Sequence, residues 1–176
     1  MRRFVMLVAL AVASASLTGC GGSMGPASSA AEGGDHPLLG AKAPDFELAA
    51  QSGGDHVSLG SEAGKVVIVD FWATWCDPCK ESFPHYQAMV DKFGGKLAVI
   101  GISVDDEPDG IKDFAKQTGA KFPLAWDEGQ ALSRQYEPST MPTSFIIDKS
   151  GVVRFVHSGF HSGEEKEIEQ QVESLL

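Results

Sequence analysis

An uninterrupted apolar segment that leads into a pair of cysteines constrains this chain more than any other feature. Residues 66–72 read Val-Val-Ile-Val-Asp-Phe-Trp, and Trp75-Cys76-Asp77-Pro78-Cys79 follows after two residues. An apolar run of this length is typical of a strand that is covered on both faces, as in a parallel sheet. Pro78 suits the first turn of a helix, because its missing N–H would have no partner there. We therefore predict a buried strand, then the cysteine pair, then a helix over about residues 77–92.

The rest of the chain alternates predicted strands and helices. Turn residues at 53–55 and at 149–151 each separate two short apolar segments, which predicts two β-hairpins. The first hairpin would use residues 46–48 and 57–59, and the second residues 143–148 and 152–157. Further strands are predicted over residues 96–103 and 122–126, and further helices over residues 108–118, 128–136 and 164–176. This order indicates one α/β domain over residues 38–176, in which helices cover a sheet.

The first 37 residues resemble targeting sequence rather than part of a core. Two arginines precede an apolar stretch over residues 4–13, which is too short to span a bilayer, since a spanning helix needs about 20 residues. Such a start is typical of a secretory signal peptide. Leu17-Thr18-Gly19-Cys20 also resembles the lipobox of bacterial lipoproteins, in which the chain is cleaved before the cysteine and the cysteine is lipidated. We expect a signal peptide over residues 1–19, lipidation at Cys20 and a flexible tether over residues 20–37, with an ordinary signal peptide as the alternative.

Charge and cysteine content exclude two classes of function. The 176 residues include 14 lysines and arginines against 24 aspartates and glutamates, a formal net charge of −10. Such a chain offers no basic stripe for phosphates, so we expect no nucleic-acid binding. Its three cysteines are too few for a four-cysteine zinc site, and its five histidines lack metal-ligand spacing. We expect no bound metal.

The predicted junction of strand and helix makes a cysteine reactive. At a helix N-terminus, unpaired N–H groups and the helix dipole favour the thiolate of Cys76. Cys79 would lie within bonding range in the same turn, so the pair can cycle between dithiol and disulfide. Asp70 is an acid inside an apolar strand, and burial without a partner would raise its pKa and make it a base near neutral pH. The alternative places Asp70 on the exposed side of an edge strand.

The segment from Val69 to Lys80 resembles the active site of the thioredoxin superfamily. Pro84, five residues after the second cysteine, and Met141-Pro142-Thr143, similar to a cis-proline loop, agree with this family. Ala43-Pro44-Asp45-Phe46 ahead of a hairpin resembles its TlpA/ResA-like, membrane-tethered branch, which is related to the AhpC/TSA redoxins. The resemblance covers essentially all of residues 38–176. It implies a thioredoxin-like fold with a central mixed β-sheet flanked by helices and an extra N-terminal β-hairpin.

The resemblance also implies roles for individual residues. Cys76 would be the more exposed, attacking thiol, Cys79 the resolving thiol, and Asp70 the acid that accepts the proton of Cys79. Trp75 and the loop residues Met141, Pro142 and Thr143 would contact the substrate, with Pro142 in the cis form. The redox-active disulfide would be the only redox group, without a separate cofactor.

The activity implied is that of an extracytoplasmic thiol-disulfide oxidoreductase, anchored by lipid to the periplasmic face of a membrane or to the cell surface. Its partners would be envelope proteins with disulfides and a transmembrane thiol-relay protein as electron donor. Relatives that mature cytochrome c carry a glutamate three residues after the second cysteine, where this chain has Ser82. Apocytochrome c therefore stays an open substrate. Asp77 places a negative charge beside Cys76, which should disfavour the thiolate and favours a reductase over an oxidant.

Two other functions are compatible with parts of the pattern. A peroxiredoxin shares the Ala43–Phe46 segment, but it needs a Thr or Ser three residues before the nucleophile and a Pro seven before, where this chain has Ala73 and Val69. A copper-handling module would hold its metal with the two cysteines and a distant histidine, for which His157 or His161 could serve.

Overall fold

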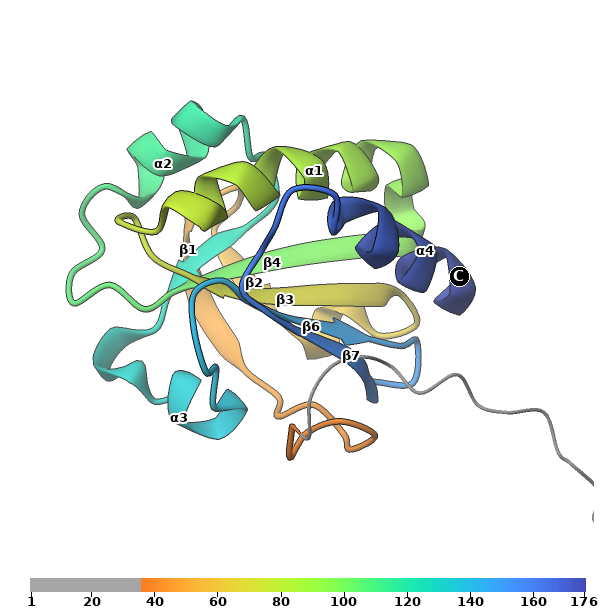
Figure 1. The fold of residues 1–176 in the computed structure, drawn as a ribbon. Helices are drawn as coiled ribbons and strands as arrows, with labels where there is room; N and C mark the ends of the chain where they lie inside the picture. Colours follow the sequence, from red (N-terminus) through yellow and green to blue (C-terminus); the bar gives the residue numbers. More distant parts are fainter. Residues whose placement is uncertain (1–35) are drawn as a thin grey trace, which may run out of the picture. The chain divides into compact units, whose positions relative to one another are not determined.

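A seven-stranded mixed sheet organises residues 36–176, the part of the chain that this computed structural model describes (Figure 1). The predicted signal peptide, the lipidation site Cys20 and the tether up to residue 35 lie outside the described residues. The strands, in the sheet order β2-β1-β5-β4-β3-β6-β7, are β2 (His56–Ser58), β1 (Glu47–Ser52), β5 (Leu124–Trp126), β4 (Leu97–Ser103), β3 (Val66–Trp72), β6 (Thr143–Ile147) and β7 (Val153–Ser158). The helices are α1 (Asp77–Phe93), α2 (Ile111–Thr118), α3 (Ser133–Tyr136) and α4 (Glu165–Leu175), with short 3₁₀ turns η1 (Gly60–Glu62), η2 (Gly94–Lys96) and η3 (Glu128–Gln130). Within residues 36–176, none of these helices has the length and apolar character needed to cross a bilayer.

The apolar run predicted as a buried strand is β3, and it lies in the middle of the sheet. It pairs parallel with β4 on one side and antiparallel with β6 on the other. All its residues are buried, including Asp70. The alternative of Asp70 on an exposed edge strand is therefore wrong.

The side chains of β3 alternate between two cores, because successive residues of a strand point to opposite faces. Val66, Ile68 and Trp72 pack in the core beneath α1, α2 and α4. Val67, Val69 and Phe71 pack in the core on the opposite face, against α3. Figure 1 shows this layering, with three helices on one face of the sheet and α3 on the other. Asp70 has the parity of the first set, so it lies on the face that α1 covers.

Two β-hairpins, β1–β2 and β6–β7, form the two edges of the sheet. β1 pairs antiparallel with β2, from Glu47 opposite Ser58 to Ala49 opposite His56. β6 pairs antiparallel with β7, with an irregularity between Ile146 and Ile147. The α/β class with a mixed sheet flanked by helices, predicted from the sequence, is confirmed.

Two predicted helices differ from those observed. The helix expected over residues 128–136 is wrong, because Gly129 (φ 66°) and Gln130 (φ 55°) adopt left-handed backbone conformations that interrupt it. Instead η3 is followed by α3, and the carboxylate of Asp127 accepts the Ser133 backbone N–H at 2.7 Å. The helix expected from residue 108 begins at residue 111, since Gly110 (φ 90°) is also left-handed.

Candidate active site

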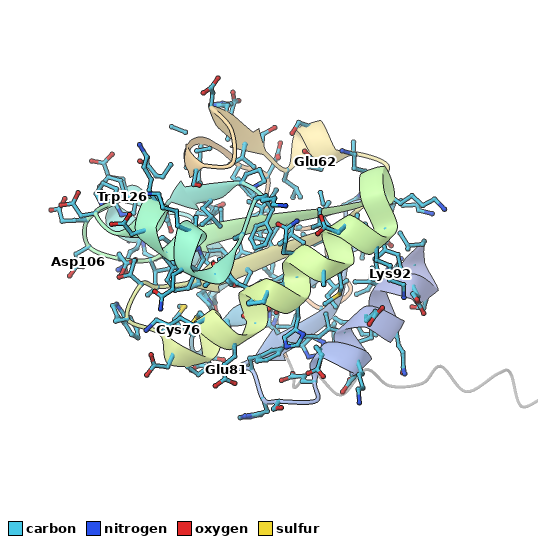
Figure 2. All side chains as sticks on the ribbon, turned by 90° about the horizontal axis from the view of Figure 1, so that it is seen from above. Glu62, Cys76, Glu81, Lys92, Asp106 and Trp126 are labelled. Atoms are coloured by element: carbon cyan, nitrogen blue, oxygen red, sulfur yellow. A yellow bond between two sulfur atoms is a disulfide. The ribbon has the colours of Figure 1, made fainter. Side chains whose placement is uncertain are left out.

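The two cysteines lie where β3 ends and α1 begins, as predicted. Figure 2 labels Cys76 at the start of this helix. Cys76 is the N-cap residue of α1, and its Sγ accepts the backbone N–H of Cys79 at 3.2 Å. The two residues form a disulfide, with their Cα atoms 5.3 Å apart. Cys76 is 3% exposed and Cys79 0% exposed, so both are buried, and Cys76 is the one that retains some contact with solvent. Among residues 36–176, this is the disulfide that the structure contains.

The turn that carries Cys76 is held by a neighbouring carboxylate. Asp105, which follows β4, accepts the Thr74 backbone N–H at 3.0 Å and the Thr74 hydroxyl at 3.0 Å. The same carboxylate accepts the Ser103 hydroxyl at 2.8 Å. Sequence reasoning missed Asp105, because its contact with Thr74 joins residues 31 positions apart.

The residues predicted to contact the substrate lie on two segments, the turn before α1 and the loop that leads into β6. Trp75 is 69% exposed and is the large hydrophobic side chain left open to solvent in the described part of the chain. The Met141–Pro142 peptide bond is cis, as the resemblance implies. Met141 packs against the buried apolar clusters on both faces of the sheet. Thr143, the first residue of β6, pairs with Phe71 near the end of β3 that leads into the cysteine turn. Thr143 is buried, and its hydroxyl donates to the carbonyl of Thr140 at 2.7 Å.

A lysine partly offsets the negative charge that Asp77 places beside Cys76. The Asp77 carboxylate contacts the Lys80 ammonium at 2.7 Å. Lys80 holds the pKa of Asp77 below its ordinary value, first through this hydrogen bond and then through its charge. Because Lys80 offsets Asp77, the argument from Asp77 against a Cys76 thiolate loses weight.

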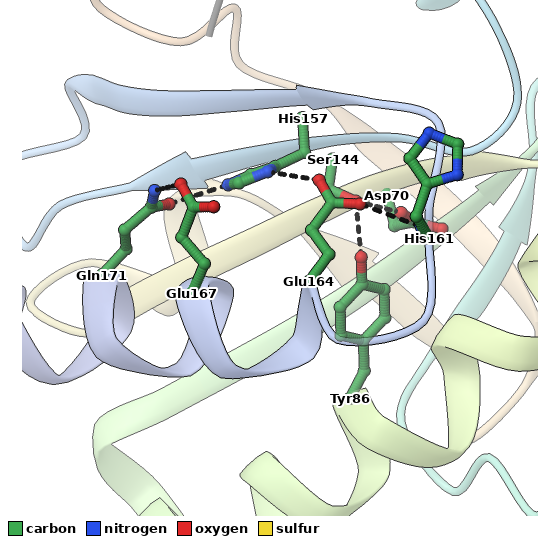
Figure 3. A network of polar contacts seen from close by, with 8 residues as sticks. All are labelled: Asp70, Tyr86, Ser144, His157, His161, Glu164, Glu167 and Gln171. Atoms are coloured by element: carbon green, nitrogen blue, oxygen red, sulfur yellow. Dashed lines mark hydrogen bonds and ion pairs between the residues drawn. The ribbon is translucent and has the colours of Figure 1, made fainter. Parts of the chain in front are cut away.

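Asp70 is fully buried on the face that α1 covers. Burial raises its pKa to about 8, and a hydrogen bond from Ser144 opposes that rise. The Ser144 hydroxyl donates to Asp70 Oδ1 at 2.5 Å, and the Tyr86 hydroxyl lies 2.7 Å from Ser144 Oγ (Figure 3). Asp70 Oδ2 is buried without a partner, as is Trp72 Nε1, among the described residues. A carboxyl group with a pKa near 8 and a free oxygen is suited to take up a proton.

Sequence reasoning also missed Ser144 and Tyr86. They stand 74 and 16 residues from Asp70 in the chain, and no local pattern links the three. The signal that could find Ser144 is sheet register, since it is the direct cross-strand neighbour of Asp70.

The histidines proposed for a copper site have other contacts. His157 is buried, with Nδ1 2.8 Å from Glu164 Oε1 and Nε2 2.7 Å from Gln171 Oε1 (Figure 3). The backbone N–H of His161 donates to the other Glu164 oxygen at 3.0 Å. Across residues 36–176, no group of three or more His, Cys, Asp and Glu side chains is placed to hold a metal ion. Both ring nitrogens of His157 are thus occupied within the protein.

Comparison with known proteins adds to this geometry. The model of the AhpC/TSA family matches residues 39–156. The thiol-disulfide oxidoreductase ResA of Bacillus thuringiensis (strain Al Hakam) is 40% identical over 91 residues, which cover 51% of this chain and 53% of that protein. The match thus spans about half the length of such relatives. The thioredoxin-like protein YneN of Bacillus subtilis (strain 168) is 33% identical over 137 residues, 76% of this chain and 78% of that protein.

A solved structure agrees over nearly its whole length. It is the crystal structure of a Chlorobium tepidum protein proposed to be the thiol:disulfide interchange protein DsbE. The TM-score is 0.73 at 36% identity, and the match covers 78% of this chain and 96% of that one. The thioredoxin-like fold is thereby confirmed.

Proposed function

The chain belongs to the AhpC/TSA family, with ResA-like relatives in the thioredoxin superfamily, and from this premise we propose that it reduces disulfide bonds in other proteins. One observation carries the proposal. A cysteine pair caps the N-terminus of α1, and a fully buried acid with a pKa near 8 lies beneath that helix. This arrangement supports Cys76 as the nucleophile, Cys79 as the resolving thiol and Asp70 as the base.

The reaction begins with the dithiol form. Cys76, as the thiolate, attacks one sulfur of the partner's disulfide, and the partner's other sulfur leaves as a thiolate. Cys79 then gives its proton to Asp70 and attacks Cys76 Sγ. The Cys76–Cys79 disulfide forms, the mixed disulfide breaks, and the partner leaves with both sulfurs reduced. Two electrons pass from the cysteine pair to the partner, and no further cofactor is needed.

The helix start supports the first step. An N-cap sulfur accepts a hydrogen bond from the backbone, here from Cys79, and the helix dipole further favours its negative charge. Trp75, exposed beside Cys76, supplies apolar contact for the partner. The cis-proline loop supplies backbone groups from Met141 to a bound peptide.

The location belongs to the same proposal. The basic and apolar start, and the Leu17–Cys20 segment, support an extracytoplasmic protein anchored by lipid at Cys20. A reductase in that place needs electrons from across the membrane, so we propose a transmembrane thiol-relay protein as donor and envelope proteins as substrates. Ser82, which donates its hydroxyl to the Cys79 carbonyl at 3.2 Å, brings no carboxylate to the site, so apocytochrome c is one substrate to test among others.

Variants at the two cysteines test the order of the steps. Cys79→Ser should accumulate mixed disulfides through Cys76, because the second attack is lost, and these would appear as adducts on non-reducing gels. Cys76→Ser should form none. A Cys79→Ser protein that traps no partner, from cell extract or from a model disulfide, would contradict the assignment of attacking and resolving thiols.

The reduction potential of the pair tests the direction. Equilibration with glutathione or dithiothreitol should give a value near about −250 mV or lower, as for thioredoxin. A value near about −120 mV would make the protein an oxidant, and the proposed donor would then be wrong.

The peroxiredoxin alternative gains nothing from the structure. Ala73 stands where a peroxiredoxin needs Thr or Ser, and Val69 stands where it needs Pro. Both are fully buried apolar residues. Fast consumption of hydrogen peroxide by the reduced protein would nevertheless favour that activity over disulfide reduction.

A further inference from the structure

A row of polar side chains crosses the sheet beneath α1. Asp70 of β3 pairs with Ser144 of β6, and Ser144 pairs with His157 of β7. Direct cross-strand neighbours share one face of a sheet. The row therefore lies on the same face as the cysteine pair, beside the buried apolar cluster that contains both cysteines.

Tyr86 of α1 extends from that helix to this row. It follows Cys79 by seven residues, which is two turns of α1, so both side chains lie on the side of the helix that faces the sheet. Both are fully buried. The Tyr86 hydroxyl lies 2.7 Å from Ser144 Oγ, and Ser144 donates to Asp70 Oδ1 at 2.5 Å (Figure 3). The Ser144 hydroxyl thus holds one carboxylate oxygen, and the Tyr86 hydroxyl holds Ser144.

The second oxygen of Asp70 has no hydrogen-bond partner among residues 36–176. A buried carboxylate oxygen without a donor costs free energy, and such atoms are rare in folded proteins. The structure contains the disulfide, in which Cys79 has no proton to donate. The free oxygen is therefore explained if its donor is the Cys79 thiol of the reduced form.

We propose that Ser144 and Tyr86 are positioning residues of the exchange reaction, which hold Asp70 Oδ1 so that Oδ2 takes the proton of Cys79. The proposal rests on the proposed function. In the step concerned, the S–H bond of Cys79 breaks and an O–H bond forms at Asp70. The electron pair left on Cys79 Sγ forms the bond to Cys76 Sγ, and the partner's sulfur leaves with the electron pair of the mixed disulfide.

Hydroxyl groups suit this task because each can donate or accept. With Asp70 ionised, Tyr86 donates to Ser144 and Ser144 donates to Asp70. When Oδ2 has taken up a proton, Oδ1 remains a carbonyl oxygen and still accepts from Ser144, so the chain keeps its direction without any movement of heavy atoms. An alanine at 144 or a phenylalanine at 86 removes one of these donors.

Other titratable groups on this face are already engaged. Cys79 and Tyr86 come from α1, His157 from β7, and Glu164 from the turn before α4. Tyr86 has a pKa well above its ordinary value, first through burial and then through the charge of Asp70, so it stays protonated and available as a donor. His157 and Glu164 bond to each other at 2.8 Å, and Asp70 bonds to neither.

A two-phase reaction separates this proposal from the proposed function. Reduced protein is mixed with 5,5′-dithiobis(2-nitrobenzoate), and the released thionitrobenzoate is followed by absorbance in a stopped-flow instrument between pH 5.5 and 8.5. The first phase reports attack by Cys76. The second phase reports resolution by Cys79, and it should rise with pH as Asp70 loses its proton.

Ser144→Ala should leave the first phase unchanged and slow the second about tenfold at pH 7, because a hydrogen bond to a charged carboxylate is lost. The rise of the second phase should move to higher pH by about one unit. Tyr86→Phe should have the same effect in smaller degree, since Ser144 still donates. Ser144→Thr, which keeps a hydroxyl, should restore the wild-type profile.

Tyr136→Phe is the matched control. Tyr136 is also buried, and its hydroxyl donates to the Pro44 carbonyl at 2.7 Å, but it lies in the core on the opposite face of the sheet. The second phase of the Tyr136→Phe protein should have the wild-type rate at every pH. The proposal is overturned if Ser144→Ala and Tyr86→Phe also keep the wild-type rate of the second phase at every pH. It is likewise overturned if these two variants slow the first phase as much as the second. Absence of the first phase in wild type would instead refute the proposed function.

Discussion

Replacing Asp70 by asparagine should make the protein more stable, although it removes the proposed base. Asp70 is fully buried, and burial raises its pKa from 3.8 to about 8. The folded protein therefore keeps the proton of Asp70 up to about pH 8, whereas the unfolded chain loses it near pH 3.8. Between these values the unfolded state binds fewer protons, so the free energy of unfolding falls as pH rises. Asparagine does not ionise, so its contribution to the free energy of unfolding does not fall as pH rises.

The magnitude follows from the pKa values. From 3.8 to pH 7, at about 1.36 kcal/mol for each pH unit, Asp70 lowers the free energy of unfolding by about 4 kcal/mol. The amide of asparagine buries an N–H group without a partner, which costs about 1–3 kcal/mol. The net gain for Asp70→Asn should therefore be about 2 kcal/mol at pH 7. At pH 4, close to the unfolded-state pKa of 3.8, the loss of stability due to Asp70 falls below about 1 kcal/mol, so the gain from asparagine should vanish or change sign.

Urea unfolding of the oxidised wild-type and Asp70→Asn proteins at several pH values between 4 and 8 measures this difference. The gap between the two free energies of unfolding should widen steadily with pH. A gap that stays constant over this range would show that Asp70 ionises with an ordinary pKa. The argument for Asp70 as a base near neutral pH would then fail. In the same variant, resolution by Cys79 should slow while attack by Cys76 persists.

Two further substitutions test packing and substrate contact. Gly101→Ala should lower the free energy of unfolding by about 1–3 kcal/mol in urea melts, because its Cβ would lie 2.6 Å from Leu124 Cδ2 and 2.9 Å from Trp72 Nε1. Gly95→Ala, whose Cβ meets nothing within 4 Å, is the control, and an equal loss there would contradict the packing argument. Trp75→Ala should leave stability within about 0.5 kcal/mol of wild type, since the side chain is 69% exposed. The same variant should raise the KM for protein disulfides in a reduction assay while its reaction with a small disulfide stays unchanged, and a KM equal to wild type would remove Trp75 from the proposed contact surface.

Local sequence was sufficient for the elements whose signals are local. Pro78 and the cysteine spacing predict the start of α1, and the apolar run predicts β3, because both depend on neighbouring residues. The helix expected over residues 128–136 failed for a different reason. Gly129 and Gln130 adopt left-handed conformations, and the Asp127 carboxylate accepts the N–H that would otherwise continue the turn. Such competition is decided by contacts, not by propensity.

By itself the sequence was sufficient to predict the chemistry proposed for the site, since Cys76, Cys79 and Asp70 stand within ten residues on one strand and the helix after it. Only the tertiary structure decided how Asp70 is held. Its central place in the sheet excludes water and raises its pKa, and the pairing of β3 with β6 brings Ser144 to its Oδ1. Desolvation depends on everything that surrounds a group, and a cross-strand hydrogen bond depends on register between segments far apart in the chain. Neither the desolvation of Asp70 nor its hydrogen bond with Ser144 can be predicted from the residues next to Asp70 in the sequence.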